Sequence, residues 1–141
     1  MNKYIKSFFK YSMLFAYGGI IYMTLEMLFR GHTDYYMSLC GGLAFILIGG
    51  LNNFIPWSMS FIKQCLIGGL CIITPLEYLF GILINQDYSI WDYREMPLNF
   101  NGQICAPFTI LWCFLSVIAI VLDDYLRYYI FNEEKPHYKL F

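Results

Sequence analysis

Four long apolar runs, separated by short polar segments, dominate the pattern of the chain. At about 1.5 Å per residue, runs of this length cover most or all of a bilayer core that is about 30 Å thick. The pattern predicts an all-α fold, a four-helix transmembrane bundle in which residues 1–141 form a single integral membrane domain. The expected spans cover residues 11–29, 35–51, 61–84 and 104–122.

Polar residues and prolines mark the places where the expected spans end or bend. Residues 52–56 interrupt a long uncharged interval, so we expect a tight turn there, with Trp57 as an interfacial anchor. Pro75 lies inside the third span and cannot donate the hydrogen bond that closes on the carbonyl four residues earlier. We therefore expect a kink about one turn before Glu77.

The placement of lysine and arginine predicts the orientation of the chain. Four spans put both termini on one side of the membrane, together with the turn before the third span. That side carries seven basic residues: Lys3, Lys6, Lys10, Lys63, Arg127, Lys135 and Lys139. The opposite side carries only Arg30 and Arg94. Because basic residues mark the cytoplasmic face, we expect a multi-pass protein of the cell membrane with both termini cytoplasmic. Residues 85–103 would then form an ordered extracytoplasmic loop, and residues 123–141 a cytoplasmic tail.

A short pattern of residues occurs twice in the chain at a constant offset of 51 positions. The matched pairs are Gly18 and Gly69, Glu26 and Glu77, Leu28 and Leu79, and Phe29 and Phe80. Such a pattern predicts two repeated helical hairpins, with Glu26 and Glu77 at similar depth in the membrane. Chance similarity between apolar segments is the competing explanation.

Composition supports a membrane protein and excludes several classes of function. The chain is 59% hydrophobic and only 13% charged, whereas soluble domains are about 25% charged. The expected partner is therefore the lipid bilayer, and the net charge of -1 leaves no basic surface for nucleic acid.

Five cysteines show neither a CxxC motif nor a histidine at metal spacing, so we expect no metal and no cofactor. A disulfide between Cys40 and Cys105, which open the second and fourth spans, stays an open alternative.

Two acidic residues inside the spans are the first candidates for a functional site. An ionisable side chain in a span costs about 2.5–3.5 kcal/mol, so it normally has a partner or a polar cavity. Arg30 follows Glu26 by one helical turn, which predicts an ion pair. Glu77 has no such neighbour in the sequence. We expect its partner to be Arg94 in the extracytoplasmic loop, residues 85–103, which we call the outer loop. Two roles stay open: ion pairs that fix the helices, or a site for ligand binding or proton handling.

The outer loop concentrates the remaining polar candidates. Trp91, Tyr93 and Phe100 alternate with polar residues, which favours a short hairpin or a re-entrant segment. Asn99 and Asn101 predict a turn followed by the N-cap of the fourth span. The expected ligand-binding residues are Glu26, Arg30, Glu77, Trp91, Asp92, Tyr93, Arg94, Asn99 and Asn101, which together could hold a cationic or zwitterionic group. Structural roles are expected for Pro75, Pro97 and Gly102.

Catalysis has little support in the sequence. The chain contains no GxSxG, HExxH or Walker motif, so no catalytic residue is assigned. An intramembrane lipid-modifying enzyme would have to rely on carboxylates and Tyr93, and it is the least favoured alternative.

A long motif in the second half of the chain resembles a known family. The residues are E-Y-L-F at 77–80, W-D-Y at 91–93, P-L-N-F-N-G-Q-I-C at 97–105, and Trp112. They resemble the bacterial family called putative ABC-transporter type IV, or CmpB-like, to which a small vertebrate transmembrane family is similar. The resemblance covers nearly the whole chain, with departures at Arg94 and Cys113, where a small residue would be expected. It implies a transporter membrane subunit whose ATPase would be a separate partner, since the chain has no ATP-binding motif.

These observations lead to two main hypotheses. The first is a transport-related membrane component that binds a small polar ligand or a lipid headgroup in an outward-facing pocket. The second is a non-catalytic scaffold or regulatory subunit held by buried ion pairs. A chain of this size has little room for a complete transport path, so we expect a homo-oligomer or an assembly with other membrane subunits.

Overall fold

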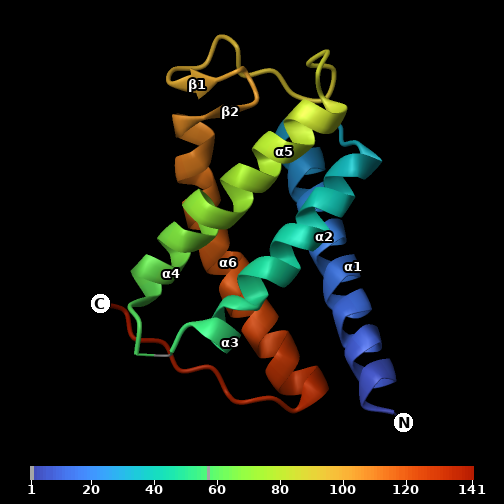
Figure 1. Cartoon of the computed structure of the whole chain (residues 1–141), viewed down its shortest axis with the longest axis vertical. Coiled ribbons are helices and arrows are strands. Elements are labelled where there is room, and N and C mark those ends of the chain that lie inside the picture. The colour runs from blue at the N-terminus through green and yellow to red at the C-terminus, as the bar shows by residue number, and fades with distance from the viewer. Residues whose placement is uncertain (1, 57) are drawn as a thin grey trace. The chain divides into compact units, whose positions relative to one another are not determined.

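The chain is mostly helical and carries a single short sheet in its described part (Figure 1). The computed structural model describes residues 2–56 and 58–141, leaving aside the side chains at positions 52 and 54. Trp57, expected as an interfacial anchor, lies outside the described residues. The elements are α1 (Lys3–Arg30), α2 (Tyr35–Gly49), α3 (Leu51–Phe54), α4 (Phe61–Ile67), η1 (Gly68–Ile73), α5 (Thr74–Ile84), β1 (Asn99–Phe100), β2 (Ile104–Cys105) and α6 (Ala106–Phe131). The prediction of a helical fold is confirmed.

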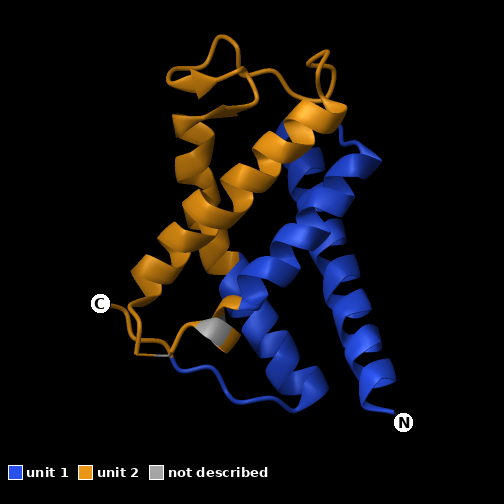
Figure 2. Cartoon of the chain, in the orientation of Figure 1, with its two compact units in different colours: residues 1–50, 119–137 blue, residues 51–118, 138–141 orange. Residues whose placement is uncertain are grey.

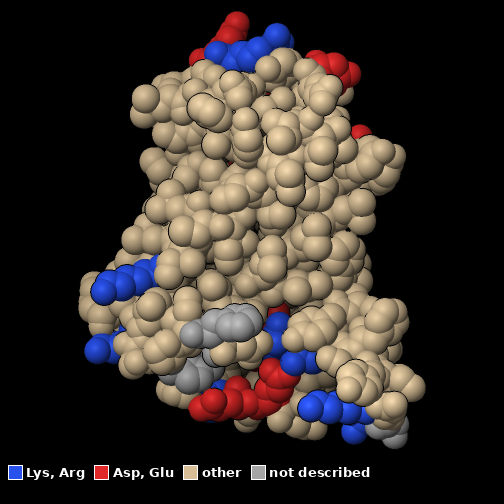
Figure 3. All heavy atoms as spheres, in the orientation of Figure 1, with Lys and Arg blue, Asp and Glu red and all other residues tan. Residues whose placement is uncertain are grey.

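Three helical stretches are long and apolar enough to cross a membrane: Lys3–Arg30, Phe61–Ile84 and Ala106–Phe131. Helix α2 is also apolar but has only 15 residues. Uncharged side chains cover most of the face drawn in Figure 3. Length, composition and surface therefore agree on a membrane protein.

Two of the helices extend beyond the spans expected from hydropathy. Helix α1 begins at Lys3 rather than at residue 11, and its start is capped by the side chain of Asn2. Helix α6 continues past residue 122 to Phe131, so the first part of the expected tail is helical. The helix continues because charges on successive turns pair with each other, as described below.

The chain divides into two compact units (Figure 2). Unit 1 comprises residues 1–50 and 119–137, and unit 2 comprises residues 51–118 and 138–141. The boundaries fall between α2 and α3 and within α6.

In unit 1, α1 and α2 pack as a hairpin whose backbones approach each other closely. A Cβ atom added to Gly19 would lie 2.8 Å from the Ser38 carbonyl oxygen, and one added to Gly42 would lie 2.8 Å from the Phe15 carbonyl oxygen. Small residues permit this approach, as in other membrane helix pairs. The turn between the helices uses Gly31, which ends α1 with φ at 76°.

Buried charges hold the end of α6 within unit 1. Asp123 is fully buried and accepts a hydrogen bond of 2.7 Å from Arg127 Nε, one turn later. Its carboxylate fills the space where a Cβ atom on Gly49 would stand, so a glycine is needed at that position of α2. Lys10 of α1 pairs with Glu133, just beyond α6. Residues 123–137 thus belong to unit 1, where several of their charges are paired.

In unit 2, helices α4 and α5 follow each other through the π-helical turn η1 without a break (Figure 1). The Thr74 N–H closes on the Gly69 carbonyl, five residues earlier, and the Thr74 hydroxyl also donates to that carbonyl at 2.8 Å. This wider turn lies immediately before Pro75, which lacks the N–H that a regular α-helix would require there. The irregularity expected around the proline therefore takes the form of a π turn.

The loop between α5 and α6 in unit 2 contains a short antiparallel hairpin. Strands β1 and β2 pair Asn99 with Cys105 and Phe100 with Ile104. Between them, Asn101 and Gly102 adopt left-handed conformations, with φ of 53° and 65°. The turn expected from these residues is present, but the expected N-cap is wrong, because strand β2 separates the turn from the start of α6.

The last residues of the chain pack beside the start of α4. The Phe61 N–H donates to the Lys139 carbonyl at 2.6 Å, and the Ser60 hydroxyl donates to the Leu140 carbonyl at 3.0 Å. The ring of Tyr138 lies 4.7 Å from that of Phe61. Residues 138–141 are therefore an ordered part of unit 2.

All five cysteines lie in the described part of the chain, and no disulfide joins any of them. The side chains of Cys40 and Cys105 are buried and serve as small apolar residues.

Candidate functional site

The buried carboxylate of Glu77 is the centre of the candidate site. Glu77 lies in α5 and is 4% exposed. The Tyr93 hydroxyl donates to its Oε1 at 2.8 Å, and the Trp112 indole N–H donates to its Oε2 at 2.8 Å. Both aromatic donors are themselves buried. Each carboxylate oxygen thus has a specific donor in an otherwise apolar span, which offsets the cost of burying the acid.

Three different elements bring these groups together. Glu77 stands in the first turn of α5, directly after the π turn, and Trp112 stands early in α6. Tyr93 comes from the outer loop, where its N–H donates to the Gly102 carbonyl at 3.0 Å. Its ring stacks on Phe108 of α6 with centroids 4.5 Å apart. The loop is therefore fixed over the carboxylate by one backbone contact and one aromatic contact.

A buried amide network closes the base of the loop. Asn85, which is fully buried, accepts from the Ile90 N–H at 2.8 Å through Oδ1. Its Nδ2 donates to the Trp91 carbonyl at 2.7 Å and to Gln103 Oε1 at 3.0 Å. The Trp91 indole donates to the Gln103 carbonyl at 2.9 Å, and Gln103 Nε2 donates back to the Asn85 carbonyl at 2.9 Å. These reciprocal bonds fasten the end of α5 to the residues that precede α6.

The sequence predicted Arg94 as the partner of Glu77, and that pairing is wrong. Arg94 instead forms a bidentate pair with Asp92, at 2.9 and 2.7 Å, and its guanidinium lies 4.2 Å from the ring centroid of Tyr88. Asp92 is close in sequence and exposed, so pairing with it leaves the guanidinium in solvent, whereas pairing with Glu77 would bury it. The hydrogen bonds from Arg94 lower the pKa of Asp92 to about 2, and those to Asp92 raise the pKa of Arg94.

The two asparagines predicted as ligand-binding residues form hydrogen bonds within the loop and to α5. Asn99 donates to the Met96 carbonyl at 2.9 Å and accepts from the Gly102 N–H at 3.1 Å. Asn101 donates to the Tyr78 hydroxyl at 3.0 Å. A Cβ atom added to Gly102 would lie 2.5 Å from Cγ of Arg94. Pro97 lies on the exposed part of the same loop.

Glu26, the other membrane acid, lies in unit 1 and has its own partners. Its Oε1 lies 3.5 Å from Arg30 Nη1, which confirms the predicted pair one helical turn apart. The Thr33 hydroxyl donates to Oε2 at 3.0 Å. Glu26 is 7% exposed, so the pair is mostly shielded from solvent. The two acids therefore belong to separate units.

Sequence reasoning missed most of the polar network in unit 2. Asn85 and Gln103 were not selected, although each is an amide placed where an apolar run meets the loop. Trp112 entered only through the family resemblance, and its hydrogen bond could not be read from a run of apolar residues. In the described part of the chain, no group of three or more histidine, cysteine or acidic side chains could hold a metal ion.

Residues 6–138 match the model of a protein family described as "Putative ABC-transporter type IV". The match spans nearly the whole chain, including the loop between α5 and α6 and most or all of each long apolar helix. Comparisons with curated proteins and with solved structures gave no match.

Proposed function

We propose that this chain, which belongs to the putative ABC-transporter type IV family, is the membrane component of a transport system that binds its ligand at Glu77. The ligand would be a small polar molecule or a lipid headgroup that carries a cationic or zwitterionic group. It would enter an outward-facing pocket, with both chain termini in the cytoplasm. An ATPase would be a separate partner.

The observation that carries this proposal is a buried carboxylate whose cover belongs to a loop. Trp112, one of the donors to Glu77, stands on a helix, whereas Tyr93, the other, stands on the outer loop. Displacing the loop would therefore release Oε1 from Tyr93 without unfolding a helix. A cationic group could then take the place of the Tyr93 hydroxyl beside the carboxylate.

The remaining loop residues would assist this exchange from the solvent side. Asp92 and Arg94 present an exposed pair of opposite charges close in sequence to Tyr93. Such a pair can attract either end of a zwitterionic ligand. Trp91, Asn99 and Asn101 would keep the loop in shape through the bonds described above, so their contribution to binding would be indirect.

The test is native mass spectrometry of protein released from gently solubilised membranes, with Glu77→Gln beside the unchanged chain. Glu95→Gln is the matched control, because Glu95 is an exposed acid in the same loop. We expect a bound small molecule or lipid that is lost in Glu77→Gln and retained in Glu95→Gln. Equal retention in both variants, with normal folding, would refute a binding role for Glu77.

A second candidate function is a scaffold or regulatory subunit held together by buried ion pairs. Two pairs within unit 1 favour it, Glu26 with Arg30 and Asp123 with Arg127. In that case the double exchange Glu26→Arg with Arg30→Glu should restore the stability that either single change removes. The mass of the assembly in the same spectra would show whether the chain associates with copies of itself or with other subunits.

A further inference from the structure

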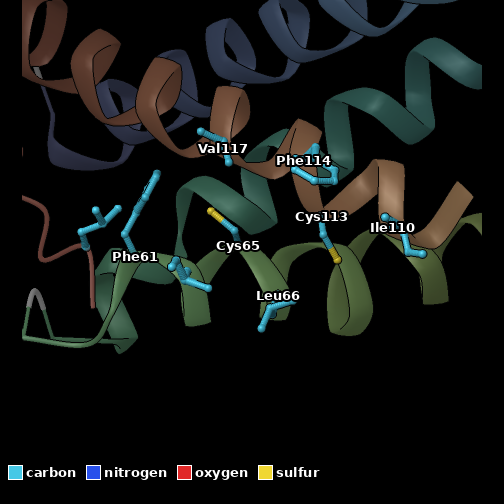
Figure 4. A pocket seen from close by; sticks show the side chains of 9 residues that line it. Phe61, Cys65, Leu66, Ile110, Cys113, Phe114 and Val117 are labelled. Carbon is cyan, nitrogen blue, oxygen red and sulfur yellow. The ribbon is translucent and has the colours of Figure 1, made fainter. Parts of the chain in front are cut away.

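Unit 2 contains an apolar groove between α4 and the first half of α6, with a volume of about 540 Å³. Its walls expose no polar surface. The lining residues are Phe61, Ile62, Cys65, Leu66, Ile110, Cys113, Phe114, Val117 and Leu140. Figure 4 shows Cys65 on α4 and Cys113 on α6 among the side chains that line this space.

The groove begins where the close contact between the two helices ends. A Cβ atom on Gly69 would lie 2.6 Å from the backbone nitrogen of Cys113, so the helices touch at that level. All lining residues of α4 precede Gly69, where larger side chains keep the helices apart. Leu140, from the segment held at the start of α4, contributes the remaining wall.

The groove lies at membrane depth. Eight of its nine lining residues belong to Phe61–Ile84 or Ala106–Phe131, the stretches apolar enough to cross a bilayer. Water would find no polar partner in such a space. The volume falls in the range of about 300–1,000 Å³ that is typical of ligand pockets. Acyl chains of the surrounding lipid are the apolar groups available to fill it.

Two lysines flank one end of the groove. Lys63 directly follows the lining residue Ile62, and Lys139 directly precedes Leu140; both lysines are exposed. The hydrogen bond from the Phe61 N–H to the Lys139 carbonyl keeps the two segments together. Neither α4 nor the segment 138–141 contains an acidic residue. The side chains of these two segments therefore carry only positive charge.

From this juxtaposition we infer that the groove binds one acyl chain of an anionic phospholipid, whose phosphate lies against Lys63 and Lys139. Apolar walls select a hydrocarbon chain, and the two ammonium groups select a negative headgroup. The site is distinct from Glu77, which lies on α5 and binds residues of the outer loop and of α6.

The test uses protein reconstituted in vesicles of equal parts phosphatidylglycerol and phosphatidylcholine, extracted in mild detergent and examined by native mass spectrometry. Val117→Trp places a large side chain in the groove and should lower the retained phosphatidylglycerol roughly tenfold. Ile118→Trp is the matched control, because Ile118 is 52% exposed and does not line the groove. Equal retention by the two variants would overturn the assignment of the acyl chain.

The headgroup is tested by the double variant Lys63→Gln and Lys139→Gln. If each lysine contributes about 1 kcal/mol, the preference for phosphatidylglycerol over phosphatidylcholine should fall roughly thirtyfold. An unchanged preference would overturn the role of the lysines. In contrast, Glu77→Gln should leave this preference intact, so a molecule lost only in that variant would belong to the Glu77 site.

Thiol labelling tests the groove without any substitution. A membrane-permeant maleimide should label Cys113 more slowly in phosphatidylglycerol vesicles than in phosphatidylcholine vesicles. Cys71 provides an internal reference, because it is exposed and lies outside the groove. Peptide mapping separates the two thiols. A labelling ratio that does not depend on the lipid would contradict occupation of the groove by the anionic lipid.

Discussion

Replacing Tyr93 with phenylalanine isolates the hydrogen bond through which the outer loop covers Glu77. The substitution removes one hydroxyl, whose oxygen lies 2.8 Å from Glu77 Oε1. It leaves the ring in place, so the stacking on Phe108 can persist. The bond from Trp112 to the other carboxylate oxygen is also unchanged. Any loss of stability therefore reports on the contacts of the Tyr93 hydroxyl, among them its bond to the acid.

The expected magnitude follows from burial and charge. Tyr93 is 3% exposed and Glu77 is 4% exposed, so water cannot replace the missing donor without entering the packed site. A hydrogen bond to a charged group contributes about 1.5–3 kcal/mol, whereas one between neutral groups contributes about 1 kcal/mol. We expect Tyr93→Phe to lower the free energy of unfolding by about 2 kcal/mol, roughly a thirtyfold change in the folding equilibrium.

The assay is equilibrium unfolding in mixed micelles of a mild detergent and dodecyl sulfate, followed by circular dichroism. Tyr129→Phe is the control, because Tyr129 is 73% exposed and its change should stay within about 0.5 kcal/mol. In a Glu77→Gln background, the cost of Tyr93→Phe should fall to about 1 kcal/mol, which gives a measurable coupling energy. If Tyr93→Phe costs no more than Tyr129→Phe, the bond does not hold the loop and the reasoning fails.

Three further predictions concern other parts of the chain. Arg127→Met leaves the buried carboxylate of Asp123 without its pair and should cost about 3–5 kcal/mol, seen as loss of monodisperse protein in mild detergent; an unaffected elution profile would argue against the pair. Gly69→Ala forces a Cβ atom against the backbone of α6. It should lower the free energy of unfolding by about 1–3 kcal/mol in the same assay. An unchanged free energy of unfolding would mean that the helices separate easily. The Asp92 carboxyl should titrate near pH 2 by carbon NMR, and its pKa should return toward 3.8 in Arg94→Gln. Because the pKa of Asp92 is lowered in the folded chain, the pair stabilises the fold above about pH 3.8. This stabilisation is lost as the pH falls through 2. A midpoint near 3.8 in the unchanged chain would contradict the pair.

The helical framework could be predicted because hydropathy reports directly on long apolar stretches. The third span was expected over residues 61–84, and the helical elements α4, η1 and α5 cover that range. The helix ends were predicted less well. Lys3 and Phe131 lie in polar flanks that hydropathy excludes, although capping and the pairing of charges one turn apart keep those flanks helical.

The polar contacts of the site could be predicted only where partners are neighbours on one helix. The pair of Glu26 with Arg30 follows from a four-residue spacing, and the structure contains it. The partners of Glu77 are 16 and 35 residues away in sequence, so periodicity carries no information about them. A search for an opposite charge led to Arg94, whereas two of the donors to the acid are the uncharged aromatic side chains of Tyr93 and Trp112.

The π turn between α4 and α5 has a geometric consequence for how this helix can be altered. A π turn holds one residue more than an α turn, and one residue corresponds to roughly 100° of rotation about the axis of an α-helix. The segment Gly68–Ile73 therefore contains an extra residue. This residue sets the angle about the helix axis between the groove residues on α4 and Glu77 on α5. Deleting one residue here would convert the turn to α geometry and keep both faces in place. A deletion between Thr74 and Glu77 would instead rotate Glu77 relative to the groove residues on α4.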